Sequence, residues 1–94
     1  MALTVDSYRP DVGRVVLSTP GDASYSTGGF AADPEKVAPM RTPKKVFVHT
    51  SSPLYTGKYD AANKKIKAYN IADGSEVTGA TDLSGVTFSL DCVL

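Results

Sequence analysis

Residues that commonly bind metals or carry redox chemistry are scarce in this sequence. Its 94 residues include one cysteine, Cys92, one histidine, His49, and no tryptophan. A structural zinc site needs about four cysteine or histidine ligands, and the scattered aspartates lack the spacing of a calcium-binding loop. We therefore expect no metal site and no cofactor.

Long apolar runs are missing as well. No segment approaches the roughly 18 consecutive apolar residues of a membrane span, and the N-terminus lacks the basic and then apolar pattern of a signal peptide. The sequence predicts a soluble domain that is made inside the cell and has no membrane partner. Its length favours one domain over residues 1–94, with a core small enough that support from a partner would help it.

An excess of one charge is also absent, but the charges are unevenly distributed. Ten basic residues balance ten acidic ones, which excludes a polycation that binds nucleic acid through bulk charge. Two basic against five acidic residues give −3 over 1–35, eight against one give +7 over 36–67, and four acidic residues alone give −4 over 68–94. Two interpretations stay open. Opposite charges pair between neighbouring strands, or one basic face meets an acidic partner or the acidic segments of another copy.

The remaining pattern predicts an all-β fold, because runs rich in Val, Thr, Tyr and Phe recur between Gly, Pro, Asn and Asp clusters. We predict a small single-domain antiparallel β-sandwich, jelly-roll-like, with one short helical turn. The strongest strand is 86–94, whose apolar residues alternate with mostly polar ones. Phe47 faces opposite to its apolar neighbours, which favours a central position between two packed layers for strand 44–50. Further strands are predicted at 12–19, at 54–60, at 64–71, around Glu76 and Val77, and at an N-terminal edge around Leu3 and Val5 that alternatively reaches onto another subunit.

Strands 54–60 and 64–71 form a predicted hairpin. In the register we favour, a three-residue bulged loop pairs Tyr55 with Tyr69 and Tyr59 with Lys65, and Asn63 takes the left-handed conformation. A four-residue loop is the alternative, and it is disfavoured because it sets Lys58 opposite Lys65.

A long loop is predicted at 20–43, and loops of this length are usually functional or interfacial. Tyr25 and Phe30 are candidates to anchor a short strand within it. Asp33 is placed to cap a helical turn that Pro34 begins and Pro39 ends.

Catalytic chemistry is not indicated. A serine or cysteine nucleophile needs a base beside it, and the single histidine lies on a strand face with Lys45 and Phe47, whereas Cys92 falls on an apolar face. The Gly28-Gly29 pair lacks the context of a phosphate-binding loop and is interpreted as a turn. We predict that the protein is not an enzyme and assign no catalytic residues.

A basic and aromatic surface is the one candidate site. Two interpretations are open. The surface is either a solvated hairpin face on which lysine stems cover tyrosine rings, or a stacking platform for single-stranded nucleic acid, which uses the same residue types. The candidate partner-contact residues are Lys64, Lys65, Lys67, Tyr55, Tyr59 and Tyr69.

Several motifs resemble small structural proteins of tailed bacteriophages. Residues 59–69 read YDAANKKIKAY, residues 74–77 read GSEV, and residues 80–88 read ATDLSGVTF. They are similar, in this order, to the C-terminal half of that family, and the opening MALTV with the YSTGG stretch at 25–29 is similar to its N-terminal half. Members look like decoration, or cement, proteins on the outside of the phage head.

The resemblance implies a virion structural protein on the outer capsid surface that is synthesised in the bacterial host cytoplasm. Its partners would be the major capsid protein and further copies of itself, as a dimer or trimer, and nucleic acid is not the expected partner. A head-to-tail or tail component of the virion is the alternative. A single-stranded nucleic-acid-binding β domain made by the host is a further one, of a different class.

Overall fold

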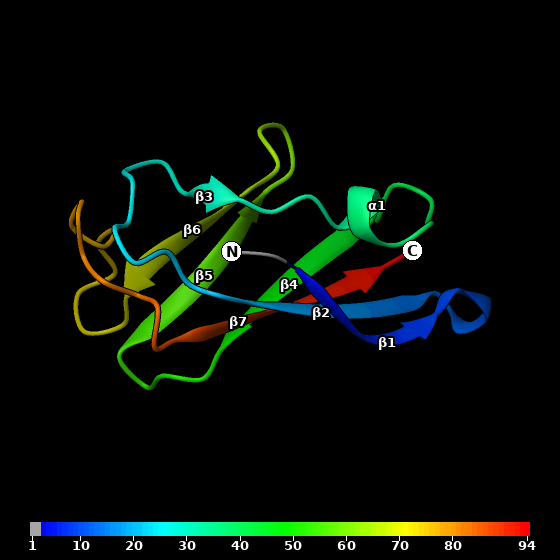
Figure 1. Ribbon diagram of the computed structural model, residues 1–94, viewed down its shortest axis with the longest axis horizontal. Coiled ribbons are helices and arrows are strands. Elements are labelled where there is room, and N and C mark those ends of the chain that lie inside the picture. The colour runs from blue at the N-terminus through cyan, green and yellow to red at the C-terminus, as the bar shows by residue number, and fades with distance from the viewer. Residues whose placement is uncertain (1–2) are drawn as a thin grey trace.

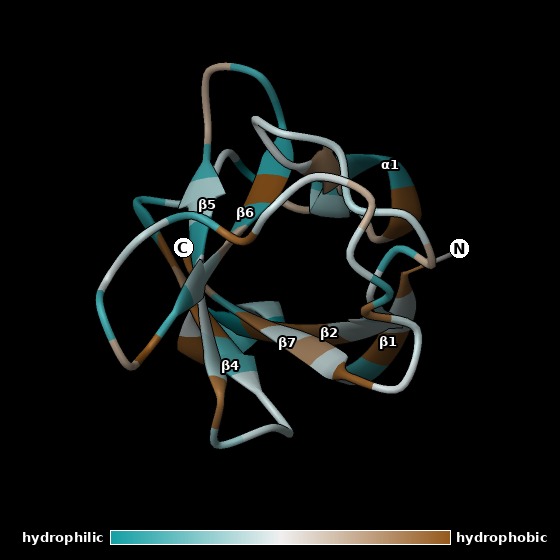
Figure 2. Ribbon diagram, turned by 90° about the vertical axis from the view of Figure 1, so that its left-hand side faces the viewer, coloured by the Kyte–Doolittle hydropathy of each residue, from teal (hydrophilic) through white to brown (hydrophobic). Residues whose placement is uncertain are grey.

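The structure, a computed structural model, describes residues 3–94 as two antiparallel sheets packed against each other (Figure 1). Figure 2 looks along the long axis and shows one sheet above the other. The strand orders are β1-β2-β7-β4 and β3-β6-β5. The predicted sandwich is confirmed. Its elements are β1 (Thr4–Arg9), η1 (Pro10–Val12), β2 (Arg14–Pro20), β3 (Phe30–Ala31), α1 (Pro34–Val37), β4 (Lys45–Thr50), β5 (Tyr55–Asp60), β6 (Lys65–Asn70) and β7 (Thr87–Val93).

Strand β7 lies inside the four-stranded sheet, between β2 and β4, and confirms the strand predicted at 86–94. Phe88, Leu90 and Cys92 point inward and are fully buried, whereas Ser89 and Asp91 alternate with them on the outer face. Removing a phenylalanine or leucine side chain from water stabilises a fold by about 1.5–3 kcal/mol. The strand is therefore a large contributor to the core.

Strand β4 lies at the end of its sheet, so the central position predicted for it is wrong. It pairs with β7 alone, and Phe47 on its outer face stays 49 % exposed. Beyond β4 the chain turns into β5 of the other sheet, where the Thr50 hydroxyl donates a 2.6 Å hydrogen bond to the Tyr55 carbonyl. A corner between the sheets thus follows β4 directly.

The corner between β4 and β5 is tightly packed. A Cβ atom added at Gly57 would lie 2.5 Å from a methyl carbon of Val48, closer than two carbon atoms can approach without displacement. Glycine at this position lets the two strands cross in contact and closes one side of the sandwich.

The predicted N-terminal edge strand is present as β1. It pairs with β2, with a bulge between Val5 and Ser7, and all six of its residues are exposed. The strand predicted at 12–19 begins later than expected, because η1 precedes it and Gly13, at a φ of 80°, reverses the chain. The resulting hairpin extends past the C-terminus in Figure 1.

The segment 20–43 contains both short elements that its local signals predict. The Asp33 side chain accepts the Glu35 N–H and caps α1, and Pro34 occupies its first turn. Phe30 begins β3 and packs edge-to-face on Phe88, with ring centroids 5.2 Å apart. The long loop therefore closes the side of the core that β6 leaves open.

Only one bridge, Tyr69 to Glu76, represents the short strand predicted around Glu76 and Val77. The Val77 N–H donates to the Ala68 carbonyl at 2.9 Å. The segment therefore pairs with β6 over two residues and does not form a strand of its own.

Candidate docking surface

The outer face of β5 and β6 is basic. Lys58, Lys65, Lys67 and Tyr69 alternate with inward residues along the two strands. On the inward side Ile66 and Ala68 are fully buried. Thr56 and Asp60 share this outer side. We call Lys58, Lys65, Lys67 and Tyr69 the basic face.

The hairpin register differs from the favoured prediction. Tyr59 lies opposite Ile66, and Tyr55 lies opposite Asn70, so the loop between the strands has four residues and the bulged register is wrong. Lys64, not Asn63, takes the left-handed conformation, at a φ of 56°.

Asp60 organises this loop. Its carboxylate accepts the N–H groups of Ala62 and Asn63 at 3.1 and 3.3 Å and the Asn63 side-chain amide at 2.9 Å. These bonds, above all those from Asn63, lower the pKa of Asp60, and Lys67 adds to the effect. The turn is thus stabilised by its own side chains.

A like-charge pair crosses the basic face. Lys58 lies directly opposite Lys67, an arrangement that is destabilising in an antiparallel sheet. The two ammonium groups turn to different partners: Lys58 Nζ lies 5.4 Å from the centroid of the Tyr69 ring, and Lys67 Nζ lies 3.7 Å from a carboxylate oxygen of Asp60. The face therefore carries three lysines, of which Lys58 lies near the Tyr69 ring and Lys67 is paired with Asp60.

The structure divides the six predicted contact residues. Lys65, Lys67 and Tyr69 belong to the basic face. Tyr55 and Tyr59 are on the inward side, partly buried against the core. Lys64 lies in the loop and pairs with Glu35 of α1 at 3.3 Å. Lys58 was missed, because neither register that we considered placed it opposite Lys67: the favoured one paired Tyr59 with Lys65, and the four-residue alternative wrongly set Lys58 opposite Lys65.

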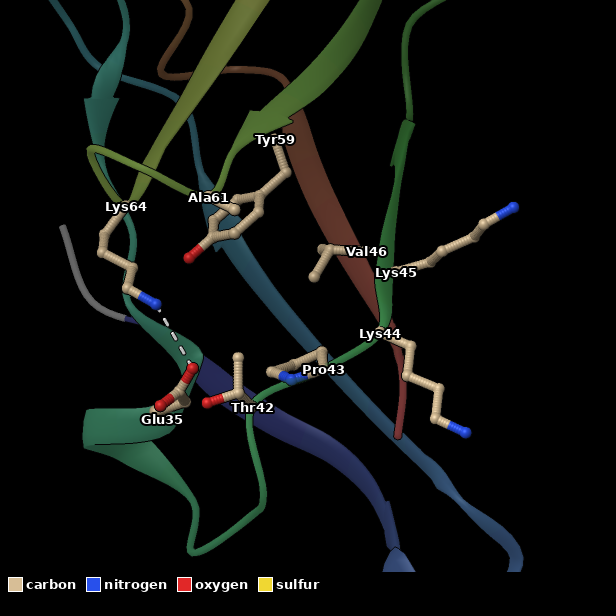
Figure 3. A pocket seen from close by; sticks show the side chains of 9 residues that line it. All are labelled: Glu35, Thr42, Pro43, Lys44, Lys45, Val46, Tyr59, Ala61 and Lys64. Carbon is tan, nitrogen blue, oxygen red and sulfur yellow. Dashed lines mark hydrogen bonds and ion pairs between the residues drawn. The ribbon is translucent and has the colours of Figure 1, made fainter.

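A small pocket of about 130 Å³ lies between this loop, α1 and the start of β4 (Figure 3). The Tyr59 hydroxyl points into it, and Lys44 and Lys45 extend away from it. Burial, with the nearby carboxylates of Asp33 and Glu35, raises the pKa of Tyr59 to about 12, so this hydroxyl stays a donor at neutral pH. The lining residues are Glu35, Thr42, Pro43, Lys44, Lys45, Val46, Tyr59, Ala61 and Lys64.

The unevenly distributed charges meet in part within the fold. Arg14 of the acidic N-terminal segment forms a two-pronged ion pair with Asp91, with an Nε to Oδ1 distance of 3.2 Å. The Arg14 to Asp91 pair joins the two acidic segments, whereas the Lys64 to Glu35 pair joins segments of opposite net charge. The basic face is different, because β5 and β6 both come from the basic middle of the chain.

The histidine and the cysteine lie on opposite sides of the four-stranded sheet. His49 is exposed on the outer face of β4, opposite Ser89. Cys92 is fully buried, and burial raises the pKa of its thiol to about 11. Within residues 3–94 no three His, Cys, Asp or Glu side chains are grouped closely enough to hold a metal ion. The same residues form no helix long and apolar enough to cross a membrane.

Comparison with protein-family models, with curated proteins and with solved structures finds no match to this chain. The resemblance to phage structural proteins therefore stays a prediction from the sequence motifs.

Proposed function

We propose that this protein is a structural component of a tailed-bacteriophage virion, a decoration or cement protein that binds the outer surface of the major capsid lattice as a homo-oligomer and stabilises it. The observation that carries the proposal is the basic face on a small β-sandwich. The motifs that resemble phage structural proteins include the loop and β6 of the hairpin that presents this face.

The opposed lysines favour an acidic partner. In the free protein Lys58 and Lys67 repel each other across the hairpin, and a carboxylate placed between them converts this repulsion into two attractive contacts. Tyr69 adds apolar contact area at the same place. The expected docking partner is therefore an acidic patch on the capsid lattice, met by many copies whose modest contacts add up through effective concentration.

A head-to-tail or tail component would use the same chemistry and is the alternative. It differs in location, because it would form rings or occupy one vertex. A single-stranded nucleic-acid-binding domain has less support, since Tyr55 and Tyr59 point inward and leave the basic face with a single tyrosine ring, that of Tyr69. A stacking platform needs free rings.

Binding to undecorated capsid shells of the phage that encodes the chain tests the proposal. We expect the wild-type protein to saturate the shells at micromolar concentration and to raise their melting temperature. The triple variant Lys58→Glu/Lys65→Glu/Lys67→Glu should bind at least about tenfold more weakly, because each contact of the face becomes repulsive.

The control variant Lys36→Glu/Arg41→Glu/Lys44→Glu changes the net charge equally through exposed residues outside the basic face. It should keep its occupancy within about twofold, since remote charges act only through the long-range field. No binding by the wild type at micromolar concentration would overturn the proposed function. Equal losses in both variants would place the docking surface elsewhere.

A further inference from the structure

Strand β1 is an open edge of the four-stranded sheet. Within residues 3–94 β1 is hydrogen-bonded to β2 on one side and to no strand on the other. At the opposite end of the same sheet, β4 packs on β5 at the corner, where Val48 lies against Gly57. Exposed edges usually carry lysine or proline, which discourage pairing with another chain, and β1 contains neither. Its protective features are a bulge beside Asp6 and the charges of Asp6 and Arg9.

Three exposed apolar side chains lie on this hairpin. Val5 is 37 % exposed, Tyr8 is 44 % exposed and Val12 is 61 % exposed. Val5 lies opposite Leu17, and Tyr8 lies opposite Val15, so both continue the inward side of the sheet beyond the core. The edge thus combines free backbone groups with side chains that would gain from cover.

We propose that β1 binds β1 of a second copy in antiparallel orientation, about a two-fold axis near the middle of the strand, and joins two four-stranded sheets into one. Such a contact must be self-complementary, and the residues of β1 satisfy this condition. The axis brings Val5 of each copy beside Tyr8 of the other, and Asp6 of each copy toward Arg9 of the other.

The charges favour a second copy over an acidic or basic partner. Asp6 and Arg9 give the strand one charge of each sign, and the whole chain has ten of each, so two copies meet without net repulsion. The inference deepens the proposed function, since it specifies how the homo-oligomer forms. A dimer of this kind carries two basic faces and would bind a lattice bivalently.

Molar mass in solution, measured by sedimentation or light scattering over a concentration series, tests the interface without any capsid. We expect a dimer for the wild-type protein. Val5→Lys places a charge beside Tyr8 of the other copy and should weaken dimerisation at least about tenfold. The matched variant Leu54→Lys changes a residue that is 66 % exposed at the far end of β5 and should leave it unchanged.

Charge exchange adds a stricter measurement. Asp6→Arg alone and Arg9→Asp alone should each weaken the dimer, up to about tenfold, because two symmetric contacts change sign. The double variant Asp6→Arg/Arg9→Asp should recover most of the affinity. A merely structural role of either residue would give no such recovery. Thermal unfolding of each variant confirms that it is folded.

Cross-linking locates the axis directly. Ser7→Cys places two thiols near each other across the axis and should form a disulfide-linked dimer on oxidation, while Leu54→Cys should not. A monomer at all concentrations, with a dissociation constant above about 1 mM, would overturn the inference. So would a trimer, or a dimer that the β1 variants leave intact. Loss of capsid binding with an intact dimer would count against the proposed function instead.

Discussion

The hydroxyl of Tyr25 donates a 2.7 Å hydrogen bond to the Glu76 carboxylate and accepts one of 3.1 Å from the Ala68 N–H. Glu76 also accepts the Gly28 N–H at 2.8 Å. Burial raises the pKa of Tyr25 to about 12, so its hydroxyl stays protonated at neutral pH. The Tyr25 hydroxyl thereby supplies a hydrogen-bond acceptor to β6 beyond the end of β3, and it connects two long loops to this strand.

Tyr25→Phe should destabilise the protein by about 1–3 kcal/mol, because the variant leaves the buried Ala68 N–H without its acceptor. Chemical denaturation measures the loss. Tyr69→Phe is the control, since its hydroxyl forms no hydrogen bond within the described residues, and it should change stability by less than about 0.5 kcal/mol. Equal effects of both substitutions would contradict this account.

Acid should weaken the fold through Glu76. The Gly28 N–H, followed by the Tyr25 hydroxyl, lowers its pKa below the ordinary value of 4.5. The unfolded chain therefore takes up the proton more readily. The stabilisation is complete above pH 4.5 and is lost as the pH falls toward the pKa of the folded state.

A thermal unfolding series from neutral to acidic pH measures this dependence. Glu76→Gln should lower the melting temperature at neutral pH and should flatten its fall below pH 4.5. Some slope should remain, because hydrogen bonds from Ser75 and Ser84 lower the pKa of Asp73 and of Asp82. Identical slopes for the wild type and the variant would refute a role of Glu76.

Two adjacent glycines should respond differently to alanine. Gly28 and Gly29 have φ values of 98° and 108°, so alanine strains the backbone at both, by about 1–2 kcal/mol. A Cβ atom at Gly29 would also lie 2.6 Å from the Ile66 carbonyl oxygen, whereas at Gly28 it meets nothing within 4 Å. We expect Gly29→Ala to lower the melting temperature by at least about 4 °C more than Gly28→Ala.

The thiol of Cys92 should react only when the protein opens. It is fully buried in β7 and its pKa is raised to about 11 by burial, so little thiolate forms and reagents have no access. Labelling with a chromogenic disulfide at pH 8 should be negligible in the folded protein and fast in denaturant. Rapid labelling of the folded protein would contradict this prediction, because it would show that the reagent reaches the Cys92 thiol without unfolding.

Elements with strong local signals were predictable from the sequence. The alternation of Phe88, Leu90 and Cys92 identified β7, and the Asp33-Pro34 pair identified α1, because period and capping depend on neighbours in the chain. The contact between Tyr25 and Glu76 was not predictable. It joins loops 51 residues apart, and nothing local specifies which acceptor a buried tyrosine meets.

The register of the basic face was mispredicted for an energetic reason. Repulsion between opposed lysines costs at most about 1 kcal/mol. The prediction of a three-residue loop nevertheless rested on avoiding such repulsion between Lys58 and Lys65. Placing Tyr55 and Tyr59 against the core yields more, since burying a large side chain stabilises by about 1.5–3 kcal/mol. Packing outweighs surface charge, and Lys58 therefore lies opposite Lys67.

The corner at Gly57 and Val48 joins the two sheets along one side of the sandwich. β4 and β5 form this joined side. On the opposite side, β1 is held by its pairing with β2 and by the hydrogen bond from the Tyr8 hydroxyl to the Pro39 carbonyl. Local opening begins where few contacts must break. Amide hydrogens of β1 should therefore exchange with solvent first and those of β7 last. A neighbouring molecule that covers β1 would suppress this local opening and slow the exchange of its amide hydrogens.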